Sequence, residues 1–242
     1  RINVDKSSHG YTKNRSIITN AQQHLDSKAL LKIDIQDFFP SIKINRVIEI
    51  FLRCGYPHNI SYYLASLCCL NSSLPQGGAT SPTISNIVLK KTDRRLNGLA
   101  RKWNLTYTRY ADDIVFSGDY IPPTFSSFVT QIINDNGFDV NRSKTTLITK
   151  KRKKIVTGIS VATSKMCLPR EKKREWRKEI YYLIKFGYHE HTKKIKVRDP
   201  IYLERMLGRL SFWKQVEPDN KFVLESIDRI NELRAKLDNI IE

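Results

Sequence analysis

The chain has 242 residues and carries 42 Lys and Arg against 24 Asp and Glu, a formal net charge of +18. Hydrophobic residues make up 40% and aromatic residues 10%, so the chain can bury a core and is not a disordered basic tail. No run approaches the roughly 20 apolar residues that a membrane span needs, and the four cysteines lack the spacing of a disulfide framework or zinc knuckle, which excludes integral membrane proteins and secreted disulfide scaffolds. We therefore expect a cytoplasmic protein with reduced, mostly buried thiols and no membrane partner. Because it starts at Arg1, we expect the sequence to begin inside a longer protein.

The positive charge is concentrated in one stretch. Residues 150–178 hold twelve basic and two acidic side chains, more than half of the net charge. Apolar residues such as Ile155 and Trp176 interrupt the stretch, so it belongs to folded structure. A hydrated surface that only aids solubility is the simpler reading, but concentrated charge of one sign favours nucleic acid.

The first half of the chain predicts a strand and three helices. Residues 30–35 read as a buried strand with carboxylates at its far end. Helices follow at 45–55, with Asn45 as N-cap and Gly55 as stop, and at 62–70. Residues 74–82 predict a Gly/Pro loop, followed by a long helix that ends near Trp103.

The second half predicts further strands and then helices only. Runs at 107–110 and 114–116 predict a hairpin with acids at its tip, and 125–133 predicts a helix ended by Asn136-Gly137. Strands are expected at 138–140, 145–149 and 154–161. After Pro169 we expect only helices. One ends at Gly187, a second begins at Asp199-Pro200, and a last one carries an apolar stripe that includes Ile240. An α+β body thus precedes an all-helical part, with the boundary near 165.

Three acids, Asp34, Asp112 and Asp113, stand where strands should end. Phosphoryl transfer from a nucleoside triphosphate needs two divalent ions, which carboxylates can hold. Adjacent carboxylates repel each other, and a shared cation offsets that repulsion. An Asp-Asp pair alone is more often a surface turn, and the apolar strands on both sides argue only weakly against that reading.

Four elements in order resemble reverse transcriptases. Tyr110-Ala111-Asp112-Asp113 resembles the YxDD box, and Asp34 in KIDIQDFFPS resembles the first metal-binding strand. LPQGGATSPTISN resembles the nucleotide-side loop and helix, and GFDVNRSKT the element that follows. Four matching elements in the same order are a specific signal of the family, whereas any one of them alone would be a weak signal. The resemblance covers about 20–160 well and implies a right-hand α+β polymerase fold. Residues 1–29 would be partial fingers and 166–242 an all-helical thumb. The palm would span 30–165, with an antiparallel sheet, the finger-side helices at 43–72 and the two-metal site.

Further strings are similar to retron reverse transcriptases. These are NAQQH at 20–24, VTG at 156–158, HGYTKNRSI near the start and LGRLSFWKQVEP in the expected thumb. One departure is visible, because the family usually has Ala-Pro after LPQG and this chain has Gly78-Ala79. The change puts in doubt how the loop faces the incoming base.

The resemblance implies roles at the catalytic centre. Asp34, Asp112 and Asp113, with the Ile35 carbonyl, would hold two Mg²⁺ ions, for which Mn²⁺ can substitute, and Lys144 would protonate the departing pyrophosphate. Phe39 matches the steric gate that excludes a 2′-hydroxyl, although a core Phe is an alternative and Phe38 beside it could take either part. The implied nucleotide-binding residues are Arg15, Asp37, Phe38, Phe39, Gln76 and Gly77.

The resemblance also implies contacts to nucleic acid. The residues concerned are Asn20, His24, Tyr110, Val156, Thr157, Gly158, Lys172, Lys173, Arg174 and Arg177. For Asn20 and His24, four positions apart on a helix, a structural hydrogen-bonded pair is an equal alternative. Residues 156–158 could be only a strand with a glycine kink. The thumb aromatics Trp176, Tyr181, Tyr182 and Trp213 should mostly be core, which leaves the basic residues outward to follow a template–primer backbone.

The function implied is RNA-directed DNA polymerisation of the retron type. A structured non-coding RNA would serve as template and primer, deoxynucleoside triphosphates as substrates, and a branched RNA–DNA hybrid (msDNA) as product, in anti-phage defence with a separate effector protein. Two alternatives stay open. One is another bacterial reverse transcriptase, group II intron-like or defence-associated and template-independent. The other is a non-catalytic RNA-binding scaffold. The presence of Phe39 and of all three acids argues against it.

Overall fold

The computed structural model describes residues 3–149 and 153–241, except for the side chains of 238–241. The chain divides into two compact units, Arg1–Thr157 with Val161–Lys165, and Gly158–Ser160 with Met166–Glu242. The basic stretch at 150–178 is shared between them. Its residues 150–152 lie outside the described residues, as does the side chain of Ile240.

The first unit is built on a four-stranded antiparallel sheet. Its strands are β1 (Ala29–Asp34), β2 (Thr106–Tyr110), β3 (Asp113–Gly118) and β4 (Thr146–Ile148), in the order β2-β3-β1-β4. The predicted strand at 30–35 and the predicted acidic hairpin are both confirmed. β1 lies in the interior of the sheet because it pairs with β3 on one side and β4 on the other, which explains why five of its six residues are buried.

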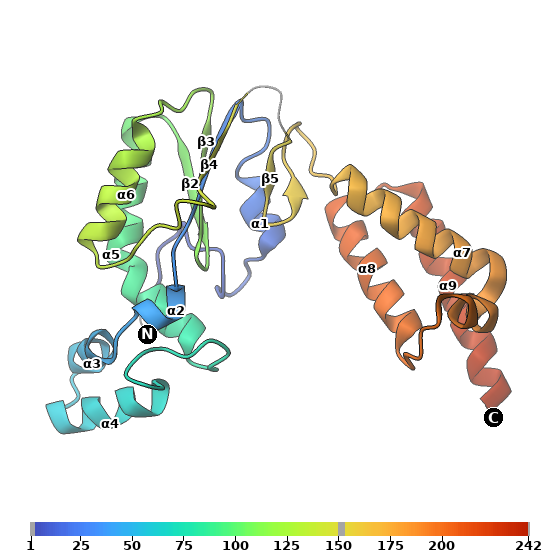
Figure 1. Ribbon diagram of the computed structural model, residues 1–242, viewed down its shortest axis with the longest axis horizontal. Helices are drawn as coiled ribbons and strands as arrows, with labels where there is room; N and C mark the ends of the chain where they lie inside the picture. Colours follow the sequence, from blue (N-terminus) through green and yellow to red (C-terminus); the bar gives the residue numbers. More distant parts are fainter. Residues whose placement is uncertain (1–2, 150–152, 242) are drawn as a thin grey trace. The chain divides into compact units, whose positions relative to one another are not determined.

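The two faces of the sheet have different partners (Figure 1). Helices α5 (Ser81–Lys102) and α6 (Phe125–Asp135) pack on one face, where Leu31 and Ile33 of β1 join Phe116 of β3 in the main core. The short helix α1 (Ile17–Gln22) lies on the other face. Alternate residues of a strand point to opposite faces, so Lys32 and Asp34 belong to the face opposite to the main core.

Three short helices follow β1. They are α2 (Phe38–Ser41), α3 (Ile44–Arg53) and α4 (His58–Cys68). The predicted N-cap of α3 is wrong: Lys43 occupies that position without a side-chain cap bond, and Asn45 lies inside the helix. Gly55 follows the helix end with a φ of 93°, which a glycine adopts without strain. Helix α4 begins four residues before the predicted position.

The segment after α6 differs from the prediction of three strands. Residues 138–140 form only an isolated bridge, between Val140 and Ile35, while β4 matches the second predicted strand. The third becomes a hairpin of β5 (Ile155–Val156) and β6 (Ile159–Ser160). Thr157 and Gly158 have φ values of 44° and 81°, so the backbone reverses between these strands rather than continuing one strand.

Apart from strand β6, the regular elements of the described part of the second unit are helices. Its helices are α7 (Arg170–Ile195), α8 (Tyr202–Val216) and α9 (Lys221–Ile241). Gly187 does not end α7 but kinks it, with φ 74° and ψ 173°. Trp176 and Trp213 meet in the core with their ring centroids 6.2 Å apart. Tyr181 and Tyr182 are exposed, so the prediction of core positions holds for the tryptophans and is wrong for these tyrosines.

The α+β class with an antiparallel sheet is confirmed. All four cysteines are free, as expected, but none is buried: Cys54 is exposed, and Cys68, Cys69 and Cys167 are partly exposed. No helix in the described part of the chain combines the length and the apolar character that a membrane crossing requires.

Candidate active site

A polar cavity of about 550 Å³ lies in the first unit, at the end of β1. Segments far apart in the sequence line it. The lining residues are Tyr11, Asp34, Ile35, Gln36, Asp37, Phe38, Phe39, Pro40, Gln76, Ala111, Asp112, Asn141 and Lys144. Two of the three predicted acids and most of the predicted nucleotide-side residues therefore share one cavity.

The strand register brings the acids together. Asp34 and Asp113 are directly paired across β1 and β3, so their side chains belong to the same face of the sheet. The amide of Ile35 donates to the carbonyl oxygen of Asp112 at 3.2 Å, which fixes the β2–β3 turn against the end of β1. Asp34 and Asp112 line the cavity, whereas Asp113 is partly buried beside it.

The acids influence one another electrostatically. Burial raises the pKa of Asp112, and the Asp34 charge raises it further, while Lys144 lowers it. Burial also raises the pKa of Asp113. The charge of Lys32 lowers this pKa, and the charges of Asp112 and Asp34 raise it further. The negative charges therefore repel across a short distance, and a cation among them would relieve that repulsion.

Lys144 lies against Asp34. Its Nζ is 3.2 Å from each carboxylate oxygen. The Lys144 side chain is 63% exposed and that of Asp34 only 12% exposed, so solvent weakens the pair. The segment that carries Lys144 is anchored to β1, because the amide of Asn141 donates to the Asp34 carbonyl at 2.8 Å.

The donor chemistry fits a divalent cation, although the described residues do not form a complete ligand cluster. In residues 3–149 and 153–241, no group of three or more His, Cys, Asp or Glu side chains is arranged to hold a metal ion. Asp113 lies outside the cavity lining, and the Lys144 ammonium contacts both oxygens of Asp34. The carboxylates of Asp34 and Asp112, which line the cavity, are nevertheless the hard oxygen ligands that Mg²⁺ takes, alongside water and phosphate.

The nucleotide-side residues lie along the same cavity. Phe38 is buried and its ring packs 5.0 Å from that of Phe39, which is only partly buried. Asp37 is exposed and has a φ of 43° at the start of α2. Gln76 lines the cavity from the loop before α5, while Gly77, with a φ of 85°, does not belong to the lining.

Comparison with known proteins assigns the family. A family model described as reverse transcriptase (RNA-dependent DNA polymerase) matches residues 2–184. The chain belongs to the reverse transcriptase family. The resemblance to retron enzymes is confirmed as well, because its curated relatives include several retron reverse transcriptases.

Two relatives illustrate the extent of the match. The chain is 36% identical to the retron Ec86 reverse transcriptase of Escherichia coli over 188 residues, which cover 76% of this chain and 59% of that protein. It is 34% identical to the retron Mx65 reverse transcriptase of Myxococcus xanthus, covering 75% and 47%. The chain thus spans about half the length of these relatives.

A solved structure supports the fold. Telomerase from Candida albicans, in complex with a fragment of telomeric RNA, matches with a TM-score of 0.51 at 10% identity, over 96% of this chain and 53% of that one. At this identity the match concerns the fold alone. It agrees with the right-hand polymerase fold expected for a reverse transcriptase.

Other predicted contacts of this reverse transcriptase domain are placed differently. Arg15 donates to the backbone carbonyls of Lys6 and Ser8, and it is not in the cavity lining. A role in gripping the triphosphate would require the side chain to leave these carbonyls, so this role stays a prediction.

The predicted nucleic-acid contacts of Asn20 and His24 are wrong in this structure, because both side chains are fully buried. The His24 ring bonds the hydroxyls of Ser117 and Thr108, each at 2.7 Å. Burial lowers its pKa to about 3, with a smaller contribution from His9, so the ring is neutral. The alternative of an Asn20–His24 pair is also wrong, since neither polar atom of the Asn20 side-chain amide has a hydrogen-bond partner in the structure.

The remaining predicted contacts outside α7 lie at two hairpins: Tyr110 ends β2 before the acidic turn, and residues 156–158 form the end of β5 and the β5–β6 turn. Val156 is fully buried, so a direct contact of its side chain with nucleic acid is excluded here. Thr157 donates to the Ile17 carbonyl at 3.0 Å and is partly exposed. Tyr110 is partly buried, with its ring 6.3 Å from that of Tyr11.

In the second unit, the basic residues at the start of α7 have varied surroundings. Lys173 forms an ion pair with Glu217 at 2.7 Å, and Lys172 lies 5.0 Å from the ring centre of Trp176. Arg174 and Arg177 are exposed, and the Arg177 guanidinium lies over Phe222 at 5.1 Å. Their contacts to nucleic acid stay a prediction.

Five residues of the cavity lining are absent from the predicted site: Tyr11, Gln36, Pro40, Ala111 and Asn141. Tyr11 lines the cavity, and burial raises its pKa together with the nearby Tyr110 and Asp112. Asn141 lines it from the segment before Lys144. Tyr11 lies inside HGYTKNRSI, which is similar to retron enzymes, and Asn141 lies inside GFDVNRSKT, which resembles reverse transcriptases in general, so these two resemblances could have indicated both residues.

Proposed function

We propose that this chain carries the catalytic centre of an RNA-directed DNA polymerase of the retron type. One observation carries the proposal: Asp34, Asp112, Phe39 and Gln76 line a single cavity. Carboxylates, a ring and a polar loop residue are the groups that metal-assisted transfer of a deoxynucleotide needs, and membership of the reverse transcriptase family supports the assignment.

Reverse transcriptase domains in general use divalent metal ions. Here Asp34, Asp112, Asp113 and the Ile35 carbonyl would hold two Mg²⁺ ions, or Mn²⁺ in their place. When bound, such ions activate the attacking hydroxyl and neutralise charge on the leaving group. Lys144 forms an ion pair with Asp34, and it would donate a proton to pyrophosphate after it leaves that carboxylate.

The partly buried ring of Phe39 supports a role as steric gate. Its ring centroid lies 6.4 Å from that of Tyr11, so two aromatic rings line the same cavity as Asp34 and Asp112. A ribose 2′-hydroxyl would meet this apolar edge, whereas a deoxyribose would not. Gln76 would pack along the incoming nucleotide, with Arg15 and Asp37 near its phosphates.

The remaining assignments follow from the retron resemblance. Residues 1–29 would be partial fingers, 30–165 the palm and 166–242 the thumb. A structured non-coding RNA would provide template and primer, giving branched RNA–DNA in the cytoplasm, in defence together with an effector protein. The exposed Arg174 and Arg177 on α7 support a contact to a nucleic-acid backbone.

The test uses the protein with an RNA template, a primer and Mg²⁺. Asp112→Asn or Asp113→Asn should abolish deoxynucleotide incorporation while RNA binding persists. Asp119→Asn is the matched control, because Asp119 is an exposed carboxylate paired with Lys28, and it should leave incorporation unchanged. Unchanged incorporation in both active-site variants would remove the proposed site.

The alternatives have their own readouts. A non-catalytic scaffold would bind RNA without incorporation in either Mg²⁺ or Mn²⁺. A template-independent enzyme would incorporate nucleotides without the RNA. Sequencing the nucleic acid that co-purifies with the protein separates a retron from a group II intron type, since only the former carries covalently branched RNA–DNA.

A further inference from the structure

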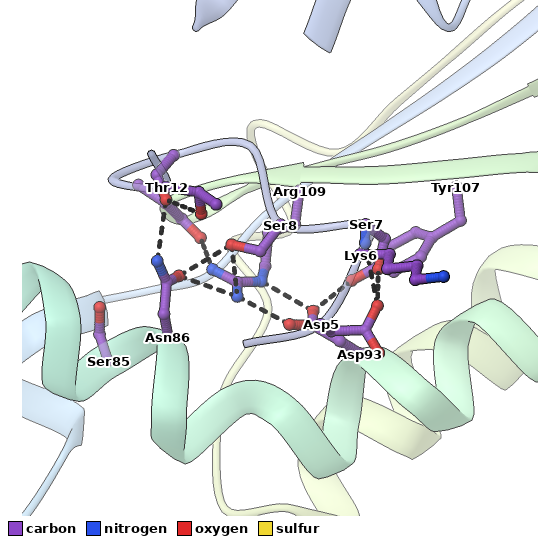
Figure 2. Close-up of polar contacts among 12 residues, drawn as sticks. Asp5, Lys6, Ser7, Ser8, Thr12, Ser85, Asn86, Asp93, Tyr107 and Arg109 are labelled. Atoms are coloured by element: carbon purple, nitrogen blue, oxygen red, sulfur yellow. Dashed lines mark hydrogen bonds and ion pairs between the residues drawn. The ribbon is translucent and has the colours of Figure 1, made fainter. Parts of the chain in front are cut away.

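A buried ion pair joins strand β2 to helix α5, and Figure 2 shows the polar contacts around it. The side chains of Arg109 in β2 and Asp93 in α5 are both fully buried. Arg109 donates from Nε and Nη2 to the two Asp93 oxygens, at 2.8 and 2.7 Å. The Tyr107 hydroxyl donates to the same carboxylate at 2.7 Å.

Such a pair is poorly explained by stability alone. Removing two charges from water costs about as much free energy as their attraction returns, and apolar residues of similar volume often serve the core equally well. Burial alone would lower the pKa of Arg109, but the Asp93 charge and hydrogen bonds raise it above its ordinary value, so the guanidinium stays charged. A fixed charge with directional donors is suited to holding other groups in place.

The Arg109 guanidinium reaches the turn that carries Asp112. Its Nη1 donates to the Ala111 carbonyl oxygen at 2.9 Å. Ala111 has a φ of 56°, a left-handed conformation that costs free energy in any residue with a Cβ and persists only when its surroundings hold it. The residue that follows is Asp112, whose position in the cavity depends on this conformation.

The same network holds the turn from its other side. Asn86 accepts from Arg109 at 3.1 Å and donates to the Gly10 carbonyl at 2.8 Å. Gly10 packs directly against the turn, because a Cβ at this position would lie 2.6 Å from the Ala111 nitrogen. Ser8 completes the network with a bond to Asn86 at 2.9 Å.

We propose that Arg109, fixed by Asp93 and Asn86, is a positioning residue that holds the Ala111–Asp112 turn in its left-handed conformation and so places the Asp112 carboxylate in the cavity. The inference rests on the proposed polymerase function only for its kinetic readout. It assigns a role to residues that do not touch the cavity contents themselves.

The first test is Arg109→Lys in the whole protein. Lysine keeps the charge but lacks the fork that reaches Asp93 and Ala111 together. We expect kcat for deoxynucleotide incorporation to fall about 10- to 100-fold with little change in the nucleotide KM or in RNA affinity. Hydrogen exchange should accelerate in the segment 107–118 and stay unchanged elsewhere in the sheet.

The matched control is Arg95→Lys. Arg95 lies on α5, the helix that carries Asp93, and like Arg109 it pairs with an aspartate: Asp135, at 2.8 Å, but both side chains of this pair are more than 40% exposed. The same chemical change should therefore leave kcat and exchange of the turn unchanged. If Arg109→Lys behaves like this control, the positioning role is overturned.

Gly10→Ala is the second variant, in case Arg109→Lys unfolds and accelerates exchange throughout the first unit. Its added methyl group displaces the turn without touching the ion pair, and we expect the same kcat loss and the same local exchange signature. Normal kcat and normal turn exchange in Gly10→Ala would overturn the inference. Hydrogen exchange needs no polymerisation, so it decides the inference even if the parent protein proves unable to incorporate nucleotides.

Discussion

The ammonium nitrogen of Lys144 lies 3.2 Å from both carboxylate oxygens of Asp34, although 110 positions separate the two residues in the chain. The lysine therefore contacts the oxygens that a divalent ion would take. Its charge also acts on the neighbouring acids, because it opposes the raised pKa of Asp112 and of Asp113.

Lys144→Met should move the acid limb of the pH–kcat profile to higher pH. Burial and Asp34 already raise the pKa of Asp112, so its carboxylate is lost as the pH falls through that raised value. Removing Lys144 removes a charge that lowers this pKa, and protonation then begins at higher pH. If Lys144 is also the proton donor, kcat at the optimum falls by at least about 100-fold.

The measurement is kcat against pH for the parent and the variant, with apparent values treated as properties of the whole acid group. Lys28→Met is the control, since Lys28 pairs with the exposed Asp119 and not with the cavity acids. An acid limb at the same pH in all three proteins would contradict the electrostatic coupling.

His24→Asn should flatten the pH dependence of stability between about pH 6.5 and 5. The folded His24 has a pKa lowered to about 3, so below pH 6.5 the unfolded chain takes up a proton that the folded chain does not. The parent therefore loses stability as the pH falls, by about 2 kcal/mol at pH 5 from this residue. The variant is less stable at pH 7 because the hydroxyls of Ser117 and Thr108 lose a partner, and its deficit should shrink at pH 5.

Urea unfolding at the two pH values measures this effect. His58→Asn is the control, because His58 is exposed at the start of α4. A deficit for His24→Asn that is equal at both pH values would show that His24 titrates normally in the folded state.

Local patterns predict the sheet and its long helices well, since their causes lie in neighbouring residues. The apolar run of β1 and the helical spacing of α6 each specify one element, and Gly137, with a φ of 71°, ends α6 as predicted. Strand register then pairs Asp34 with Asp113 without any further signal.

Long-range contacts could not be predicted in the same way. The partners of His24 lie 84 and 93 positions away, and the spacing of a helix suggested Asn20 instead. In the sequence, Arg109 is an ordinary residue of a predicted strand, and its ion pair becomes visible only in the fold, where α5 places Asp93 against it. Arg15 reads as a phosphate ligand by its resemblance, whereas the fold supplies two backbone carbonyls first.

Phe39→Ala should admit ribonucleotides. The Phe39 ring lines the cavity beside Tyr11, and its removal opens space where a 2′-hydroxyl would lie. We expect the discrimination in kcat/KM between deoxy- and ribonucleotides to fall by at least about tenfold. Phe128→Ala is the control, because Phe128 is 46% exposed on α6. Equal use of both sugars by the parent enzyme would contradict the gate.

Gly78→Ala should raise the nucleotide KM several-fold. Position 78 is where related enzymes usually have alanine, but here a Cβ would lie 2.7 Å from the Ser81 hydroxyl and 2.9 Å from Pro75. The buried Ser81 donates to the carbonyl of the partly exposed Pro75 at 2.8 Å, so the added methyl group displaces a partly buried hydrogen bond in the loop that carries Gln76. Loss of this bond costs about 1–3 kcal/mol.

The control for this variant is Gly98→Ala, on the exposed side of α5, where an added Cβ meets no atom within 4 Å. Alanine suits a helix interior better than glycine, so this change should stabilise the protein by about 0.5–1 kcal/mol and leave the KM unchanged. Thermal unfolding and steady-state kinetics on both variants separate the two effects. A normal KM and normal stability in Gly78→Ala would mean that the loop adapts to the alanine by moving Ser81 without disturbing Gln76.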